Sequence, residues 1–393
     1  MLRFTGLANQ DRRRRLEEAL LPTLVALLVA LVCGELLILA HGESPAEVYR
    51  ELLQGTWGNA YGLGQVLFKA TTLTFTGLAV GLGLRAGLFN IGAESQLAAG
   101  GFAAALTGLA LPSGTPALAA IPVCLLAAIL GGGLVGAVPG VLKAKFGAHE
   151  VIVTIMLNFV VLAALNWVVV AHLHVPESVH TPEIHAGGLA KLSRIFPSFH
   201  GSAANLSLVV ALLTVIGTAF VLFRTRFGFD LRAVGLQPDA AEYGGVRPSR
   251  IYLLALTFSG ALAGLGGINS VLGYHGYYED GFAGGAGFLG IAVALVGRND
   301  PFGIALAALF FATLSQGGLA IHALVPRQMM EVLQAIVIIA VAASVPEVRR
   351  ILRLARRPRP TIDRSSTAST AADGPAGPQE PGVNVSAGHG GSR

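Results

Sequence analysis

Charge is scarce in this sequence. Only 12% of its 393 residues are Asp, Glu, Lys or Arg, whereas 53% are hydrophobic. A soluble domain of this length carries about twice that share of charge, so the composition excludes a soluble globular protein and predicts a polytopic membrane protein. The formal charge of +5 lies mainly at the termini and in short polar segments. That distribution indicates membrane topology and does not imply binding to nucleic acid.

Cysteine and the common catalytic motifs are equally sparse. The two cysteines, Cys33 and Cys124, lie within apolar runs, so we interpret them as packing residues without a disulfide framework or metal spacing. No Gly-Lys pair occurs, which excludes a P-loop, and the HExxH and GxSxG motifs are missing. We therefore expect no enzyme activity, no cofactor and no metal, and any ATP that drives this protein must bind to another chain.

What is present is a series of long apolar runs. They predict an all-α fold of about ten transmembrane helices, because about 20 apolar residues cross a hydrocarbon core of about 30 Å. We place the spans near residues 20–40, 65–84, 90–110, 116–142, 151–171, 205–223, 251–270, a segment ending at 297, 302–320 and 329–346. Residues 90–105 resemble residues 281–297 in their density of small residues, which favours an inverted repeat of spans two to five and seven to ten.

Short segments rich in Lys and Arg fix the predicted orientation, because such segments stay in the cytoplasm. They are the N-terminus, the turns near 143–145 and 298–301, the central loop 224–250 and the segment after 348. Both termini are therefore predicted to be cytoplasmic. The domains are a basic N-terminus, 1–19, a transmembrane domain, 20–347, and a basic, then low-complexity tail, 348–393, which we expect to be disordered.

The central loop 224–250 contains five Arg, two Asp and one Glu between two uncharged spans. Within it, Pro238 is predicted to begin a short helix that Gly244 and Gly245 end. We interpret the loop as the attachment point of a cytoplasmic partner, the alternative being a solvated basic linker. On the other side, the loop 172–200 carries several histidines without acidic or Cys partners, which favours partner docking or solvation over a metal site.

Two polar clusters are predicted at membrane depth or at the membrane's edge. Asn90, Glu94 and Gln96 follow Arg85, and Asn158 lies in the fifth span with Asn166. Polar side chains in spans are costly and usually face the protein interior or an aqueous path. The first cluster either lines a transport pathway or fixes architecture, with Glu94 pairing with Arg85 or capping a broken helix. Asn158 could also face the pathway, although packing is the commoner role of such amides.

Four stretches together resemble a known family. They are RAGLFNIGAESQ (85–96), LKAKFGAHEVIVTIMLNF (142–159), LRAVGLQPDAAEYGGV (231–246) and GFLGIAVALVGRNDPFG (287–303). In this order they are similar to the permease subunits of bacterial ABC importers for nucleosides and simple sugars, which are related to ribose and branched-chain amino acid permeases. Leu289 departs from the polar residue common in that family, which weakens any inference about the solute.

The resemblance implies a multi-pass permease in the bacterial inner membrane that works by alternating access. Its partners would be a cytoplasmic ABC ATPase, a second permease that makes a heterodimer, and an extracellular or periplasmic substrate-binding lipoprotein. The ATPase-coupling residues that match the family's docking element are Pro238, Asp239, Ala240, Ala241 and Gly245.

Under this resemblance, residues 20–347 form the permease domain, and the solute is a small neutral polar molecule, most readily a nucleoside or a simple sugar. Its pathway would pass Asn90, Glu94, Gln96 and Asn158. Two alternatives remain open. One is a branched-chain amino acid permease. The other is a stand-alone secondary transporter or channel, which would need its own coupling-ion site, and Glu35 and Glu94 are the acids deep enough to supply it.

Overall fold

The computed structural model describes residues 28–29, 31–322, 324–326 and 328–340. The chain divides into two units, residues 1–349 and 350–393, and every described residue lies in the first. The predicted basic N-terminus and the tail after 348 are outside the described residues. Within the described part, helices and turns dominate, and the β-structure consists of two isolated bridges, His180 with Glu279 and Lys191 with Asn205.

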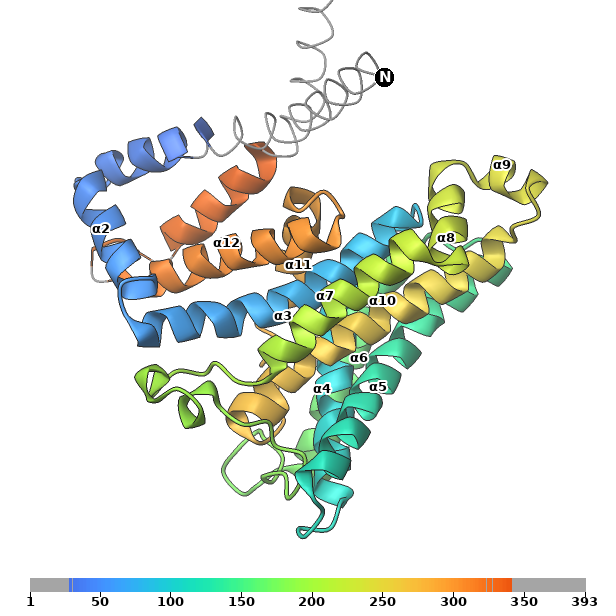
Figure 1. The fold of residues 1–393 in the computed structure, drawn as a ribbon, viewed down its shortest axis with the longest axis horizontal. Helices are drawn as coiled ribbons and strands as arrows, with labels where there is room; N and C mark the ends of the chain where they lie inside the picture. The colour runs from blue at the N-terminus through green and yellow to red at the C-terminus, as the bar shows by residue number, and fades with distance from the viewer. Residues whose placement is uncertain (1–27, 30, 323, 327, 341–393) are drawn as a thin grey trace, which may run out of the picture. The chain divides into compact units, whose positions relative to one another are not determined.

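The helices follow the predicted apolar runs. They are α2 (Pro45–Thr56), α3 (Ala60–Arg85), α4 (Ala93–Ala110), α5 (Ala117–Phe146), α6 (Glu150–Val168), α7 (Ser207–Arg224), α8 (Arg226–Leu236), α9 (Pro238–Tyr243), α10 (Pro248–Ser270), α11 (Ala286–Val296) and α12 (Pro301–Ala320). Short apolar helices also cover Leu31–Ala40 and Gln328–Ala340. In Figure 1, α3, α7 and α10 run side by side, and each packs against the other two.

Six helical segments among the described residues are long and apolar enough to cross a membrane. They are Ala60–Arg85, Ala117–Phe146, Glu150–Leu173, Ser207–Arg224, Pro248–His275 and Pro301–Ala320. The chain is thus an all-helical, multi-pass membrane protein, while the count of about ten spans remains a prediction. The eighth predicted span is represented by α11, whose 11 residues reach only about 16 Å. It starts late because Gly281, Gly284 and Gly285 have positive φ and keep the preceding segment in turns.

The contact between α5 and α10 is made by bare backbone. Gly132, Gly136 and Gly140 of α5 face α10, as the spacing of these glycines predicts for a helix–helix contact. An added Cβ at Gly264 would collide with the carbonyl of Ala128, and one at Gly136 would collide with that of Leu256. In lipid, where apolar burial gives no preference for another helix, such close packing supplies the attraction.

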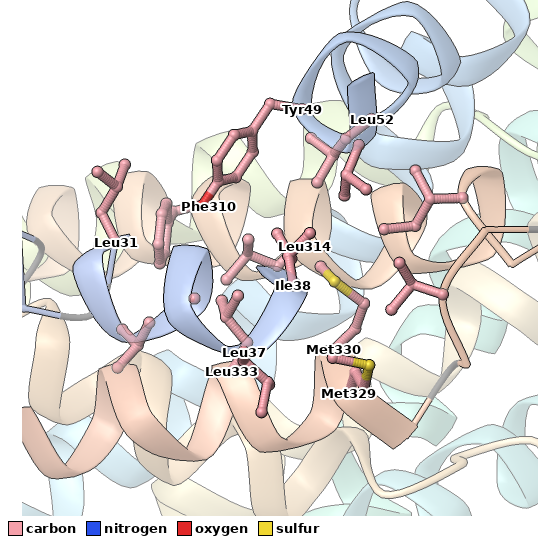
Figure 2. A pocket seen from close by; sticks show the side chains of 15 residues that line it. Leu31, Leu37, Ile38, Tyr49, Leu52, Phe310, Leu314, Met329, Met330 and Leu333 are labelled. Atoms are coloured by element: carbon pink, nitrogen blue, oxygen red, sulfur yellow. The ribbon is translucent and has the colours of Figure 1, made fainter. Parts of the chain in front are cut away.

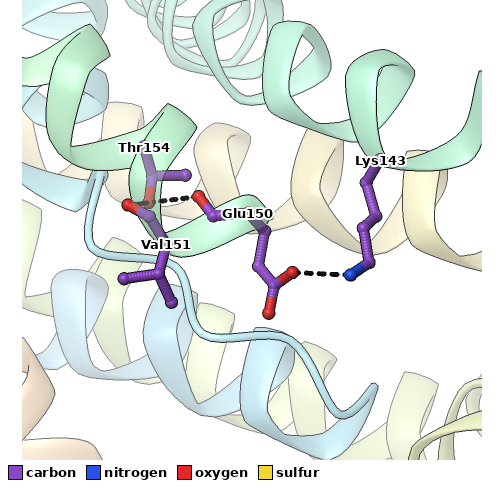
Figure 3. A network of polar contacts seen from close by, with 4 residues as sticks. All are labelled: Lys143, Glu150, Val151 and Thr154. Carbon is purple, nitrogen blue, oxygen red and sulfur yellow. Dashed lines mark hydrogen bonds and ion pairs between the residues drawn. The ribbon is translucent and has the colours of Figure 1, made fainter. Parts of the chain in front are cut away.

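A charged turn joins α5 to α6 at the end predicted to be cytoplasmic. Gly147 ends α5 in the left-handed conformation, with φ of 66°. The ammonium of Lys143 lies 2.8 Å from the carboxylate of Glu150, which begins α6 (Figure 3). The acid at one helix start and the base at the other helix end also match both helix dipoles, so the pair stabilises this tight turn.

The turn between α11 and α12 is also stabilised by an acidic side chain, Asp300. Arg298 and Asn299 take positive φ, and the Asp300 carboxylate accepts hydrogen bonds from the backbone N–H groups of Phe302 and Gly303, both at 3.1 Å. Asp300 is thus the N-cap of α12, followed by Pro301 at the first helical position.

Candidate functional site

The polar cluster predicted from sequence surrounds a break between α3 and α4. Residues 86–92 are not helical, so their buried backbone groups need hydrogen-bond partners from elsewhere in the protein. The Asn90 amide donates to Gln96 Oε1 at 2.8 Å and to Ser259 Oγ at 2.7 Å, and its oxygen accepts from Gly92 N–H at 2.9 Å. Asn90 and Gln96 are buried, at 0% and 1% exposure, so they satisfy this break from inside the protein.

Helix α6 closes the other side of the break. The Asn158 amide donates to the Ile91 carbonyl at 2.9 Å, and its oxygen accepts from Ser95 N–H at 3.1 Å. One turn earlier, Thr154 Oγ1 accepts from Ile91 N–H at 3.3 Å. Asn158 is thus hydrogen-bonded to the break and to the start of α4. A buried backbone group without a partner costs on the order of several kcal/mol, and Asn158 removes that cost here.

Glu94 lies in the first turn of α4 and reaches the start of α11. Its two carboxylate oxygens accept from Gly285 N–H at 2.8 Å and Gly287 N–H at 2.6 Å. The carboxylate therefore caps α11, where the positive end of the helix dipole favours an anion. Of the two architectural alternatives predicted from sequence, helix capping is the arrangement found, although the capped helix is distant in the sequence.

Arg85 has other partners. Its Nε donates to the Asn299 carbonyl at 2.9 Å, and its guanidinium lies 5.7 Å from the centroid of the Phe223 ring. The guanidinium of Arg232 in α8 lies 5.2 Å from the same centroid. These contacts tie the end of α3 to α7, α8 and the α11–α12 turn.

Glu94 also borders a cavity of about 310 Å³ between α4, α6 and the segment after α10. The cavity is lined by Glu94, Ala98, Leu162, Ala163, Asn166, Tyr278, Asp280, Gly281, Phe282 and Ala283. A second cavity of about 400 Å³ is lined by Gly284 and Gly285, which follow Ala283 in the chain, and by α11, α12 and the helix Gln328–Ala340. The Gly-rich segment 281–285 therefore lines both cavities.

The loop 172–200 holds the rim of the first cavity. Thr181 N–H donates to the Tyr278 carbonyl at 2.9 Å, and Tyr278 N–H donates to Thr181 Oγ1 at 3.0 Å. Nearby, the His180 ring stacks on Tyr277 with centroids 4.2 Å apart. Burial, followed by the charge of Asp280, raises the pKa of Tyr278, so its hydroxyl stays neutral.

A third cavity, of about 210 Å³, is of a different kind. Figure 2 shows side chains from the helix Leu31–Ala40, α2, α12 and the helix Gln328–Ala340 pointing into it. Its labelled lining is aliphatic, aromatic or methionine, with the Tyr49 hydroxyl as its polar group. Such a lining offers too few hydrogen-bonding groups to orient a polar solute.

The predicted coupling segment forms two helices, α8 and α9. The short helix begins at Pro238 and ends before Gly244, and Gly245 has a φ of +84°, as the sequence predicts. Asp239 and Ala240 are exposed, and Tyr243 is 95% exposed, whereas Ala241 is buried against the apolar cluster below. Gly235 of α8 lies against the backbone of residues 85–87, so an added Cβ there would collide with the Arg85 carbonyl.

The sequence pattern did not identify Ser259 as a member of the polar cluster around Asn90. Ser259 of α10 accepts from Asn90 and donates to the Ala79 carbonyl at 2.6 Å, yet a single serine in a Gly-rich span is common and gives no pattern. Asp280 was visible as an acid next to a Gly-rich segment, but its place beside α6 depends on tertiary packing.

Known proteins place the chain among transport components. Residues 62–342 match the family model described as "Branched-chain amino acid transport system / permease component". A guanosine ABC transporter permease protein of Bacillus subtilis, NupP, is 37% identical over 83% of this chain and 93% of its own length. A glucose ABC transporter permease protein of Haloferax volcanii, TsgB13, is 34% identical over 80% of this chain and 85% of its own.

A nucleoside ABC transporter permease protein of Lactococcus lactis, NupB, is 32% identical over 80% of this chain and 88% of its own length. No solved structure matches the chain significantly.

Proposed function

Because the chain belongs to the family of branched-chain amino acid transport system permease components, we propose that it forms the membrane pathway of an importer for nucleosides. It is a multi-pass protein of the cell membrane and a permease subunit of an ABC importer. It is not itself an enzyme, since ATP hydrolysis in such importers belongs to a separate ATPase chain, and a substrate-binding protein delivers the solute. The similarity to guanosine and nucleoside permeases over most of the chain carries the choice of nucleoside over sugar.

The ATPase docks on α9. Pro238, Asp239, Ala240, Ala241 and Gly245 form the docking element, in which Ala241 anchors the helix and the acid and neighbouring face remain exposed. Movement of α9 reaches the membrane through α8, since Gly235 touches the backbone at the end of α3. The complex contains a second, similar permease as the other half of a heterodimer, and the binding protein is a lipoprotein that docks on the opposite side, at the loop 172–200.

The pathway runs beside the break at residues 86–92. Glu94 borders it directly, and Asn90, Gln96 and Asn158 hold the backbone that surrounds it. ATP-driven movement of α8 and α9 would shift this segment and open the path alternately to each side.

About ten spans, with both termini in the cytoplasm, complete the proposed topology. Helices occupy most of the described part of each predicted span, and the starts of α4 and α11 meet at Glu94, an arrangement expected of two inversely related repeats. In this topology residues 20–347 form the permease domain, flanked by cytoplasmic segments 1–19 and 348–393. Single cysteines at positions 178 and 243, labelled from each side of a vesicle in a background lacking Cys33 and Cys124, would test it. Labelling of both from the same side would contradict it.

Reconstitution tests the function. The chain, its partner permease and the ATPase are placed in vesicles, and uptake of guanosine and glucose is measured with the binding protein and ATP. We expect guanosine uptake that requires all components. Glucose uptake without guanosine uptake would assign the protein to sugars. Uptake by the chain alone under an ion gradient would instead identify a secondary transporter.

A further inference from the structure

We propose that the 310 Å³ cavity between α4, α6 and residues 278–283 is the nucleoside-binding site inside the permease, and that Asp280 and Asn166 determine specificity there. This inference rests on the proposed function, which names the solute class but not where the solute binds. Binding sites for small molecules are concave and mostly apolar, with a few polar groups that converge on the ligand, and they begin at about 300 Å³.

The two polar side chains are available to a ligand. In the described part of the chain, neither the Asn166 amide nor the Asp280 carboxylate makes a side-chain hydrogen bond or an ion pair. The amides of Asn90, Gln96 and Asn158, by contrast, are all used by protein groups. A carboxylate accepts hydrogen bonds from hydroxyl and N–H groups, and an amide both donates and accepts. Together they match ribose hydroxyls or the polar edge of a nucleobase.

The walls of the cavity suit a flat ring. The partly exposed Phe282 ring is the aromatic face open to a ligand. The Tyr278 ring is only 1% exposed and supports Phe282 at a centroid distance of 5.4 Å, with Phe102 packed on Tyr278 at 5.2 Å. Leu162 and Ala163 form the apolar wall on α6. Aromatic faces bind nucleobases by stacking, and they contribute about 1–3 kcal/mol per base in single-strand binding proteins. A sugar without a base would leave this surface unused.

Glu94 is a positioning residue in this site. Both of its oxygens are bound to Gly285 and Gly287, so its carboxylate fixes the segment that carries Asp280 and Phe282. Thr181 fixes the same segment from the outer loop through Tyr278. The site is therefore held at both ends before a ligand arrives. The 400 Å³ cavity adjoins this site, because Ala283 lines one cavity and Gly284 the other. Its lining includes Ser315 and Gln334, and it offers the next position on the path.

Photolabelling tests the location directly. The reconstituted complex is irradiated with 8-azidoguanosine, and the modified peptides are mapped by mass spectrometry. We expect labels within residues 94–98, 162–166 or 278–283 that excess guanosine prevents. Labels confined to other segments of this chain, or labels in these segments that guanosine does not reduce, would overturn the proposal.

Substitution tests the two residues. Asp280→Asn and Asn166→Leu should each lower guanosine uptake at least about tenfold at saturating binding protein, as expected for loss of a hydrogen bond to a polar ligand. The control is Glu279→Gln, which removes the adjacent acid that does not line the cavity and should leave uptake unchanged. Melting temperatures in detergent identify any variant that fails to fold, and the labelling of the wild-type complex remains decisive in that case.

The outcomes separate the two proposals. If the wild-type complex takes up guanosine but both variants equal it, the site assignment is wrong and the proposed function stands. If the wild-type complex takes up glucose and no nucleoside, the proposed function and this ligand class both fail.

Discussion

The α5–α10 contact and the α8–α9 segment are opposites within one chain. In the first, glycines on both helices bring backbone against backbone, with no room for a single methyl group. In the second, Leu236 and Tyr243 are 85% and 95% exposed, and an added Cβ at Gly245 would meet nothing within 4 Å. The first region leaves no space between its helices, whereas the second exposes large apolar side chains.

Glycine and exposed apolar side chains therefore have different roles in the two regions. A glycine in α5 or α10 is required by close approach, while Gly245 is required by its positive φ. Exposed leucine on a span faces lipid and needs no partner. Exposed Leu236 and Tyr243 end α8 and α9, which lie outside the candidate spans, and a protein partner is the natural cover for such side chains. Substitutions in the two regions should therefore have different effects. Those in the α5–α10 contact should destabilise the fold, and those in α9 should impair function without loss of stability.

The largest effect is expected at the tight contact. Gly264→Leu would drive a side chain into the Ala128 carbonyl, and overpacking of this kind costs about 3 kcal/mol or more. We expect little monodisperse protein and no uptake, measured by size-exclusion chromatography and vesicle assays. The control is Gly217→Leu in α7, where an added Cβ meets nothing within 4 Å and stability should be equal or higher. Equal behaviour of the two variants would show that the contact is not close.

A smaller effect, confined to function, is expected on α9. Asp239→Arg reverses an exposed charge, so thermal stability should change by no more than about 0.5 kcal/mol. Uptake and ATPase copurification should fall at least about tenfold, because a reversed charge at a docking surface costs several kcal/mol. Glu47→Arg on α2 makes the same change on an exposed acid away from α9, and should leave both unchanged. Normal copurification of the Asp239 variant would remove α9 from the interface.

Glu94 tests the region between these extremes. Glu94→Ala removes the acceptors of the buried Gly287 N–H and the partly buried Gly285 N–H, and should destabilise the protein by about 1–3 kcal/mol. Glu94→Gln keeps one acceptor and should lie between this variant and the wild type. Thermal unfolding in detergent measures both. Two variants as stable as the wild type would mean that the carboxylate does not hold α11.

The smallest effect is expected at the charged turn. Lys143→Gln removes the partner of Glu150, and a partly exposed ion pair is worth about 0.2–1 kcal/mol. A double-mutant cycle with Glu150→Gln, measured by thermal unfolding, isolates the pair. The coupling should shrink in 1 M salt, because added salt weakens the attraction between charges that are partly exposed to water. A coupling energy of zero at low salt would show that helix dipoles alone stabilise the turn.

Much of the fold follows from the sequence. The apolar runs predicted the positions of the helices, the glycine spacing in α5 predicted a contact face, and Pro238 with Gly244 and Gly245 predicted α9. These are local signals, set by the period of a helix or by the conformations open to one residue. The same rules did not reveal that α8 is helical, because Arg and Asp within a polar loop are compatible with helix and coil alike.

The candidate site was predicted only in part. Asn90, Glu94, Gln96 and Asn158 stand out because polar groups are costly in lipid, but that cost does not say whether water, solute or protein satisfies them. Glu94 caps a helix that lies about 190 residues away in the sequence, at Gly285 and Gly287. Asp280 and Asn166 reach the same cavity only because α4, α6 and the Gly-rich segment meet.

The sequence by itself determined that this chain is a membrane protein, and it determined where most of the helices lie, since both depend on composition and short-range spacing. Only the tertiary structure decided which buried polar groups are already satisfied and which still face open space. The physical reason is that a hydrogen bond requires two groups within about 3 Å, and here the partners come from helices far apart along the chain.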